Sequence, residues 1–123
     1  MITFADISHH QSVVDLNAYA AAGHDRVFLK ATQGLSYVDP TFTARWRQAG
    51  ALGLARGAYH FAEADNDGGA EFDHFLSVVL AADAIGERDI LCLDAEDTAH
   101  TSRAAAHAAQ FTACAVVRGY PTG

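Results

Sequence analysis

Residues Ala70–Asp94 read AEFDHFLSVVLAADAIGERDILCLD, and the two ends of this stretch follow different hydrophobic patterns. In the first part, apolar side chains recur at positions i, i+3, i+4, i+7 and i+8, which predicts an amphipathic helix over Ala70–Ala84. Gly86 ends this helix, and the apolar run Asp89–Leu93 predicts a short buried strand after it. A helix that leads into a buried strand is the repeating unit of α/β proteins with parallel strands.

The same alternation of strand and helix continues on both sides of this stretch. The further predicted strands are Ile2–Ile7, Arg26–Ala31 and Leu54–Phe61, with a loop over Thr32–Asp39. The further predicted helices are Val14–Ala22, a helix that Asp39 caps and that ends near Ala51, and a last one from Thr101 or Ser102 to about Arg118. Such units connect with right-handed crossovers and can curl toward a barrel. The sequence therefore predicts one α/β domain over residues 1–123, of the parallel (β/α)-barrel type, with only the first four to five βα units of a TIM-like barrel.

The composition restricts the class of partner. Of the 123 residues, 50% are hydrophobic and 19% are charged, which indicates a globular domain rather than a disordered chain. Fifteen Asp and Glu residues against eight Lys and Arg residues give a formal charge of −7. Nucleic acids and anionic membranes are bound through clustered Lys and Arg, so we expect neither as a partner. The chain also has no apolar run near the roughly 18 residues of a membrane span, and it starts without the basic and apolar regions of a signal peptide.

Acidic side chains stand at the C-terminal ends of predicted strands, where parallel sheets form their sites. Asp94 and Glu96 are two residues apart, so an extended backbone puts both side chains on one face. Two carboxylates that lie close together repel each other, so the pKa of one rises while the other stays low. This split supplies a proton donor and an anion, which is the equipment for cleaving a glycosidic bond. Asp6, after the first predicted strand, adds a third carboxyl group.

Four more side chains are candidates for contact with a substrate. Tyr59 stands at a strand end, where we expect its ring to contact substrate, and His60 is expected at the floor of the site or against a sugar. Tyr37 fits a sugar contact and a place in the core equally well. Lys30 lies inside an apolar strand, so its charge is expected to pair with a site carboxylate. His107 is expected to be a solvated helix residue.

The histidines also allow a different kind of site. His9, His10 and His60 could combine with the carboxylates of Asp6 and Asp94 in a metal-dependent hydrolase. These histidines lack the tight spacing of metal ligands on one element. We therefore expect neither a metal nor another cofactor.

Five short motifs, in this order, resemble glycoside hydrolase family 25, the Chalaropsis-type lysozymes. They are Asp6–Gln11 (D-x-S-x-x-Q), Phe28–Gly34 (which contains K-A-T-x-G), Tyr37–Phe42 (Y-x-D-P-x-F), Gly57–Phe61 (G-x-Y-H-F) and Leu93–Glu96 (L-D-x-E). One position departs from this pattern: Gln33 stands where the family usually has Glu, which removes a charge and keeps hydrogen bonding. The resemblance implies a flattened, modified (β/α) barrel.

The resemblance also implies an activity and a set of roles. Members of the family are muramidases, which cut the β-1,4 bond between N-acetylmuramic acid and N-acetylglucosamine in peptidoglycan. By resemblance, Glu96 is the general acid. Asp94 is the second carboxylate, either as a nucleophile or as a group that orients the acetamido group of the substrate for internal attack. Asp6 makes hydrogen bonds within the site, and the partner is the glycan strand of bacterial peptidoglycan.

The chain is shorter than the domain of that family, so we expect a domain truncated at its C-terminus. Two alternatives to an active muramidase follow: an inactive or cell-wall-binding remnant, and a metal-dependent hydrolase on a similar scaffold. A partial barrel exposes a strand edge, through which copies of the chain can associate. Without a signal peptide, the protein is expected to stay in the cytoplasm until a holin-type route releases it, or to be secreted by a non-classical route.

Overall fold

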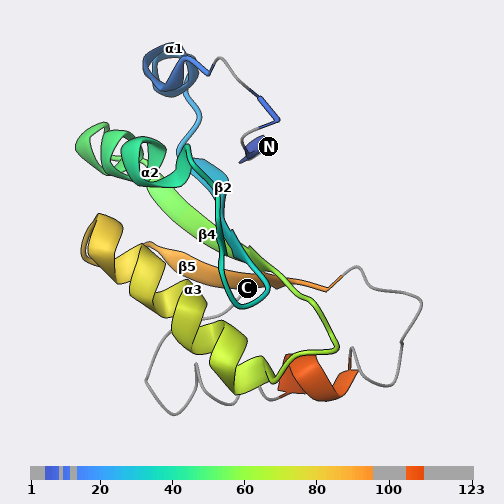
Figure 1. The fold of residues 1–123 in the computed structure, drawn as a ribbon. Helices are drawn as coiled ribbons and strands as arrows, with labels where there is room; N and C mark the ends of the chain where they lie inside the picture. Colours follow the sequence, from blue (N-terminus) through green and yellow to red (C-terminus); the bar gives the residue numbers. More distant parts are fainter. Residues whose placement is uncertain (1–4, 9, 12–13, 96–104, 110–123) are drawn as a thin grey trace.

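The computed structural model describes residues 5–8, 10–11, 14–95 and 105–109, with the backbone alone at residues 5 and 6 (Figure 1). Strands and helices alternate along these parts of the chain. The strands are β1 (Ala5–Ile7), β2 (Arg26–Gln33), β3 (Tyr37–Val38), β4 (Ala55–Phe61) and β5 (Ile90–Asp94). The helices are α1 (Leu16–Ala21), α2 (Phe42–Ala51) and α3 (Gly68–Ala82). Residues 105–109 form one further helical segment, inside the last helix that the sequence predicts.

Four of the strands form a parallel sheet in the order β1, β2, β4 and β5, which confirms the predicted parallel α/β class. The strand β3 departs from the prediction, because it pairs antiparallel with β2 in a region expected to be a loop. Gly34 makes this reversal possible, since its φ of +59° is a conformation that other residues adopt only with strain. The strand β2 also ends at Gln33, two residues after the predicted strand Arg26–Ala31.

The two faces of the sheet differ in what covers them. Figure 1 shows α2 and α3 on one face, and the side chains of β2 and β4 that point to this face are fully buried. Val27, Leu29 and Ala58 meet Trp46 of α2 and Phe75 of α3 in one hydrophobic cluster. The opposite face, which we call the second face, carries half-buried side chains. Those on β2 and β4 are Phe28, Lys30, Gln33, Tyr59 and Phe61.

A β-bulge in β2 decides which side chains reach the second face. Lys30 pairs with Tyr59, but Thr32 pairs with His60, so Ala31 is an extra residue on the β2 side. In a regular strand, residues three apart point to opposite faces. The bulge instead brings Gln33 to the same face as Lys30, and Lys30 Nζ donates a hydrogen bond to Gln33 Oε1 over 2.8 Å.

The N-cap of α2 differs from the predicted one. Asp39 is not the N-cap residue, which is Thr41. The backbone N–H of Asp39 donates to Ala31 O over 2.8 Å, and this bond holds Asp39 beside the sheet. From there its buried Oδ1 still accepts from the backbone N and the hydroxyl of Thr41, at 2.8 and 2.6 Å. The carboxylate therefore supports the helix start from two residues before the N-cap.

The N-terminal ends of β4 and β5 are joined by a buried ion pair. Arg56 Nη2 lies 2.7 Å from Asp89 Oδ2, and both side chains are almost fully buried. The guanidinium also stacks over the ring of Trp46, at 4.2 Å from its centroid, and donates to Trp46 O over 3.1 Å. A shallow pocket of about 370 Å³ lies here, lined in part by Gly53 and Glu87. It is at the end of the sheet opposite to the predicted site, so it belongs to the scaffold.

Within the residues that the structure describes, no helix is long and apolar enough to cross a bilayer.

Candidate active site

Asp94 lies at the C-terminal end of β5, in a row of residues that crosses the sheet. It is the register partner of Phe61, which is in turn the partner of Gln33, and Gln33 pairs with Tyr37 of β3. Residues in register across parallel strands point to the same face. The half-buried Asp94 therefore belongs to the second face, away from α2 and α3.

The other two predicted carboxylates lie at the limit of the described chain. Glu96 is outside the described residues, and its role stays a prediction. For Asp6 the structure describes the backbone, which pairs with Phe28 of β2. Since β2 and β4 separate β1 from β5, Asp6 and Asp94 stand on opposite outer strands of this part of the sheet.

The contacts of Lys30 with the described residues are all to neutral groups, and its predicted pairing with a site carboxylate stays a prediction for the side chains of Asp6 and Glu96, which lie outside the described part. Among the described residues its ammonium contacts a neutral group, the side-chain amide oxygen of Gln33, at 2.8 Å. The ammonium also lies 5.2 Å from the ring centroids of both Tyr37 and Phe61. Two aromatic faces and an amide dipole therefore stabilise this charge where a carboxylate was expected.

Two tyrosines predicted to contact substrate lie beside Lys30. Tyr59 is its register partner in β4 and is half-buried. Tyr37 is more exposed, with 37% of its surface accessible. Burial and, to a smaller extent, the Asp39 carboxylate raise the pKa of Tyr37 above its ordinary value. The Tyr37 hydroxyl is thus neutral at physiological pH.

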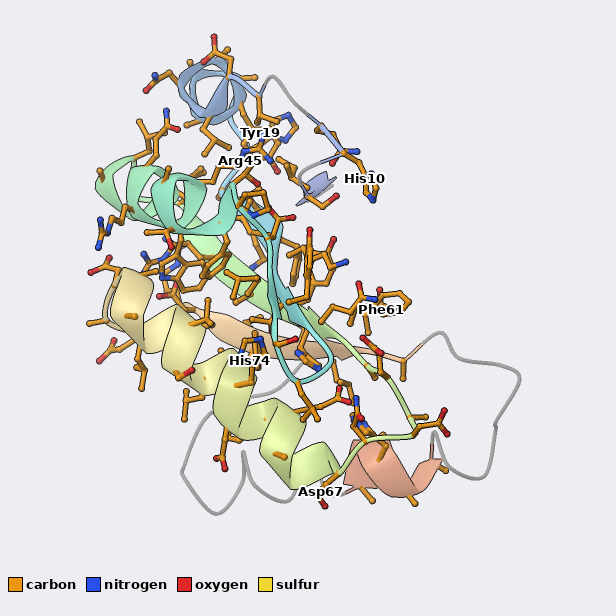
Figure 2. The ribbon with its side chains drawn as sticks, viewed as in Figure 1. His10, Tyr19, Arg45, Phe61, Asp67 and His74 are labelled. Carbon is orange, nitrogen blue, oxygen red and sulfur yellow. The ribbon has the colours of Figure 1, made fainter. Side chains whose placement is uncertain are left out.

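His60 is placed behind the second face. Its side chain is fully buried on the helix side of the sheet, so a direct contact with sugar is not available to it. Nδ1 lies 2.7 Å from Thr32 Oγ1, and Nε2 lies 2.6 Å from Glu71 Oε1. Figure 2 shows Phe61, the next residue, on the side of β4 that points away from α3. Of the two positions expected for His60, the floor of the site is the one that the structure supports.

Glu71 is the centre of a buried polar network that the sequence reading missed. Its Oε1 also accepts a hydrogen bond from the backbone N of Glu63 over 3.2 Å and lies 3.1 Å from His107 Nε2. His107 is 2% exposed, so the expectation of a solvated residue is wrong. Figure 1 shows the helix that carries His107 beside the start of α3. The sequence did contain a signal that Glu71 is buried. Glu71 is four residues before Phe75 and therefore falls on the apolar stripe of α3.

The charge states in this network follow from burial and hydrogen bonding. Burial lowers the pKa of His60 below its usual value, although the hydrogen bond to Glu71 opposes this effect. Burial acts to raise the pKa of Glu71, but hydrogen bonds from His60 and from the Glu63 backbone outweigh it and hold the pKa below its usual value. At neutral pH, an ionised Glu71 therefore accepts a hydrogen bond from a neutral His60.

The loops beyond β1 and β2 are fixed by contacts within the resembling motifs. Gln11 Oε1 accepts a hydrogen bond from Ser8 N over 2.8 Å and closes the turn after β1. Arg45 of α2, which the sequence reading missed, donates to Ser8 O over 2.8 Å and also to Gln11 O. At Gly34, the φ of +59° favours glycine, and a Cβ atom there would meet the carboxylate end of the exposed Glu63 side chain. These polar contacts hold the loops at the strand ends where a substrate would bind.

Metal ligands were one alternative for this site. In residues 5–95 and 105–109, as far as the structure describes them, no group of three or more His, Cys, Asp and Glu side chains could hold a metal ion.

Comparison with known proteins identifies the family. The family model described as glycosyl hydrolases family 25 matches residues 5–118. Lysozyme M1 of Streptomyces globisporus is 38% identical over 73 residues, which are 58% of this chain and 25% of that protein. The N,O-diacetylmuramidase of Chalaropsis sp. is 38% identical over 76 residues, or 58% of this chain and 36% of that protein. The structure of a muramidase from Trichobolus zukalii superposes with a TM-score of 0.80 and 26% identity.

The shared part is a fraction of each relative. The superposition covers 98% of this chain but 63% of the Trichobolus zukalii chain, and the two sequence relatives are matched over about a third of their length or less. Within that part, the family match includes β1 to β5 and the three helices between them. The motifs, the sheet and the family match agree, and the chain belongs to glycosyl hydrolases family 25.

Proposed function

We propose that this chain carries the catalytic carboxylates of a peptidoglycan muramidase, which hydrolyses the β-1,4 bond between N-acetylmuramic acid and N-acetylglucosamine. The observation that carries the proposal is the position of Asp94 at the C-terminal end of β5, on the face opposite to the helices. Parallel α/β proteins form their active sites at this end of the strands. Family membership and the names of the relatives, a lysozyme and an N,O-diacetylmuramidase, support the same reaction.

In this proposal Glu96 is the general acid and protonates the leaving oxygen of the glycosidic bond. Asp94 is the second carboxylate, and it acts as nucleophile or orients the acetamido group of the substrate for internal attack. Asp6 supports the site by hydrogen bonding. Glu96 follows Asp94 by two residues, and we expect the two carboxylates to lie close together, which would favour a protonated Glu96 because two nearby carboxylates cannot both ionise easily.

The contacts to the glycan come from the second face. Tyr59 and Tyr37 offer their rings to sugar, and Lys30 offers a positive charge between them. His60 has a different role in this proposal, because its buried side chain fixes β4 from behind. It therefore holds Tyr59 and Phe61 in position without touching the substrate.

The test is the release of reducing ends from purified peptidoglycan by the 123-residue chain and by the Glu96→Gln variant. Loss of a general acid lowers the rate by roughly 10²–10⁴-fold, so the variant should retain about 1% of the activity or less. Glu87→Gln is the matched control, since Glu87 is exposed at the far end of the sheet. Equal activity of Glu96→Gln and the parent protein would contradict the assignment of the acid.

Two other outcomes would favour the alternatives. A parent chain that binds peptidoglycan without cleaving it would be a cell-wall-binding remnant. Activity that a chelator abolishes, and that added metal restores, would indicate a metal-dependent hydrolase. Analysis of the products by mass spectrometry distinguishes a muramidase from an enzyme that cuts the other glycosidic bond of the strand.

The proposed substrate sets the place of action at the bacterial cell wall. Two routes to the wall fit this proposal: release from the cytoplasm by a holin-type protein, and secretion by a non-classical route. Fractionation of producing cells with and without a co-expressed holin separates them. Release that depends on the holin supports the first route, and release from intact cells without it supports the second.

We also propose that copies of the chain associate through the edge of the sheet. Among the described strands, β5 pairs with β4 alone, and an unpaired strand edge is a template for pairing. Light scattering after size exclusion tests this proposal over a range of protein concentrations. A monomer at every concentration would contradict it.

A further inference from the structure

Four side chains on the second face form what we call the Lys30 cluster: Lys30, Gln33, Tyr37 and Phe61. The ammonium of Lys30 is at its centre, 2.8 Å from the Gln33 amide oxygen and 5.2 Å from each ring centroid. The members come from three strands, β2, β3 and β4. The bulge at Ala31 brings the side chains of Lys30 and Gln33 onto one face.

The electrostatics of the cluster are unusual for a half-buried lysine. Its contacts among the described residues are an amide oxygen and two aromatic faces, and none of them carries a negative charge. These neutral groups stabilise the ammonium without cancelling its charge, because an amide dipole and two ring quadrupoles carry no net charge. Lys30 is also the only lysine of a chain with a formal charge of −7. Among the described residues, the contacts within the cluster thus include one positive charge and no negative charge.

The side chains around the ammonium offer a ligand two kinds of contact. An ammonium has three N–H donors, and Gln33 occupies one of them. Tyr37 is 37% exposed and Phe61 is half-buried, so their rings present apolar surface beside the charge. An anionic group with an apolar or sugar ring attached to it matches this combination.

We propose that the Lys30 cluster binds a carboxylate of the substrate. This inference rests on the proposed function, because it assigns the carboxylate to peptidoglycan. Two parts of peptidoglycan supply this chemistry: the lactyl group of muramic acid, where the peptide stem is absent, and the carboxylates of the stem itself. Three members of the cluster, Tyr37, Gln33 and Phe61, lie in the same row of residues as Asp94, and Phe61 is its register partner. The cluster therefore selects the acidic sugar or its stem beside the catalytic carboxylates.

Calorimetric titration of the 123-residue chain tests the proposal, in the Glu96→Gln variant so that ligand is not consumed. The probes are the N-acetylglucosaminyl-N-acetylmuramic acid disaccharide, its neutral lactyl amide, the same disaccharide with a peptide stem, and neutral chitobiose. Lys30→Met removes the charge and retains most of the apolar stem. Gln33→Glu retains Lys30 and supplies it with an internal carboxylate, and Lys30→Arg keeps the charge as a control.

Lys30→Met and Gln33→Glu should each weaken the binding of a carboxylate probe by about tenfold, the effect of losing one charged hydrogen bond. The neutral probes should change by less than about twofold, and Lys30→Arg should keep most of the affinity for the acid. Dependence of the bare disaccharide on Lys30 assigns the lactyl carboxylate, and dependence of the stem-bearing probe alone assigns the stem. Added salt should weaken only the carboxylate probes.

Two results would overturn the inference. The first is an equal loss of affinity for acidic and neutral probes in Lys30→Met, which indicates a merely structural lysine. The second is a parent protein that shows no preference for the acidic probes over the neutral ones. Failure of the proposed function looks different, since a chain that does not cleave peptidoglycan can still show carboxylate binding that depends on Lys30.

Discussion

His60 Nε2 lies 2.6 Å from Glu71 Oε1, and neither side chain has accessible surface. This contact links the third parallel strand to the first turn of α3, and Thr32 and His107 extend it to β2 and to the helix of residues 105–109. Buried polar groups are costly unless they are hydrogen-bonded. The network therefore stabilises one arrangement of these four elements, directly behind the proposed binding residues.

Removal of the charge of Glu71 tests how much stability this network supplies. Glu71→Gln keeps the shape of the side chain but replaces charge-assisted hydrogen bonds, each worth about 1.5–3 kcal/mol, by neutral ones. We expect the free energy of unfolding in urea to fall by about 1–3 kcal/mol. Asp73→Asn is the matched control, because Asp73 lies on the exposed side of the same helix. Similar losses in the two variants would show that the network adds nothing beyond the helix itself.

The same network predicts that mild acid destabilises the fold. The folded-state pKa of His60 is below the value of about 6.5 in the unfolded chain, so the unfolded state binds the proton more readily. The contribution of His60 to stability is thus complete above about pH 6.5 and is lost as the pH falls toward its folded pKa. Glu71, whose pKa is also lowered, adds a second loss below about pH 4.3.

Unfolding free energies measured between pH 8 and pH 5 check the first of these losses. The parent protein should lose stability as the pH falls through about 6.5. His60→Gln removes the titrating ring, so the variant should be less stable at pH 8 and should show a flatter profile below it. An unchanged slope in this variant would assign the acid sensitivity to other histidines.

A second pair of variants tests the scaffold at the other end of the sheet. Asp89→Asn removes the buried carboxylate partner of Arg56, and breaking a buried ion pair by removing one partner costs about 3–5 kcal/mol. Asp83→Asn removes a carboxylate 3.0 Å from the same guanidinium, but the Asp83 side chain is 49% exposed. We expect a much smaller loss there, because water screens an exposed pair. Thermal unfolding measures both effects, and equal losses would mean that burial does not decide the strength of these pairs.

The architecture could be predicted because its main helices and strands have a regular spacing of apolar residues. The apolar stripe of α3 and the apolar runs of β2, β4 and β5 each carry their own signal in the sequence. The predicted α3 began two residues late, at Ala70, because the helix takes its cap from Asp67, which accepts a hydrogen bond from Ala70 N over 2.8 Å. A capping residue inside a polar loop has little to distinguish it from its neighbours.

The candidate site could be predicted only in part. Lys30, Phe61 and Asp94 lie on one face, as regular alternation along β2, β4 and β5 predicts. The neutral partner of Lys30 could not be foreseen, since the bulge that aligns Gln33 with it depends on pairing with β4. The same holds for His107, whose burial depends on a contact with Glu71 that is 36 residues away in the chain.

The bulge also makes a prediction at Thr32, which it turns toward His60 and the helix side of the sheet. An ionised Glu71 accepts a hydrogen bond from Nε2–H of a neutral His60, so Nδ1 must accept one from the hydroxyl of Thr32. Thr32→Val has nearly the same shape but leaves Nδ1 buried without a donor, which costs about 1–3 kcal/mol. Thr32→Ser keeps the donor and loses one methyl group, at about 1 kcal/mol.

The valine variant should therefore be less stable than the serine variant, although valine is the better residue for a strand. Urea unfolding gives the order of stability, and ¹⁵N shifts of the imidazole report the tautomer of His60. Because Thr32→Ser retains the hydroxyl donor, it should keep the ¹⁵N shifts of the parent protein. Thr32→Val should move the Nδ1 signal. A valine variant as stable as the parent would mean that the hydroxyl does not hold this ring, and that packing alone fixes β4 behind the proposed site.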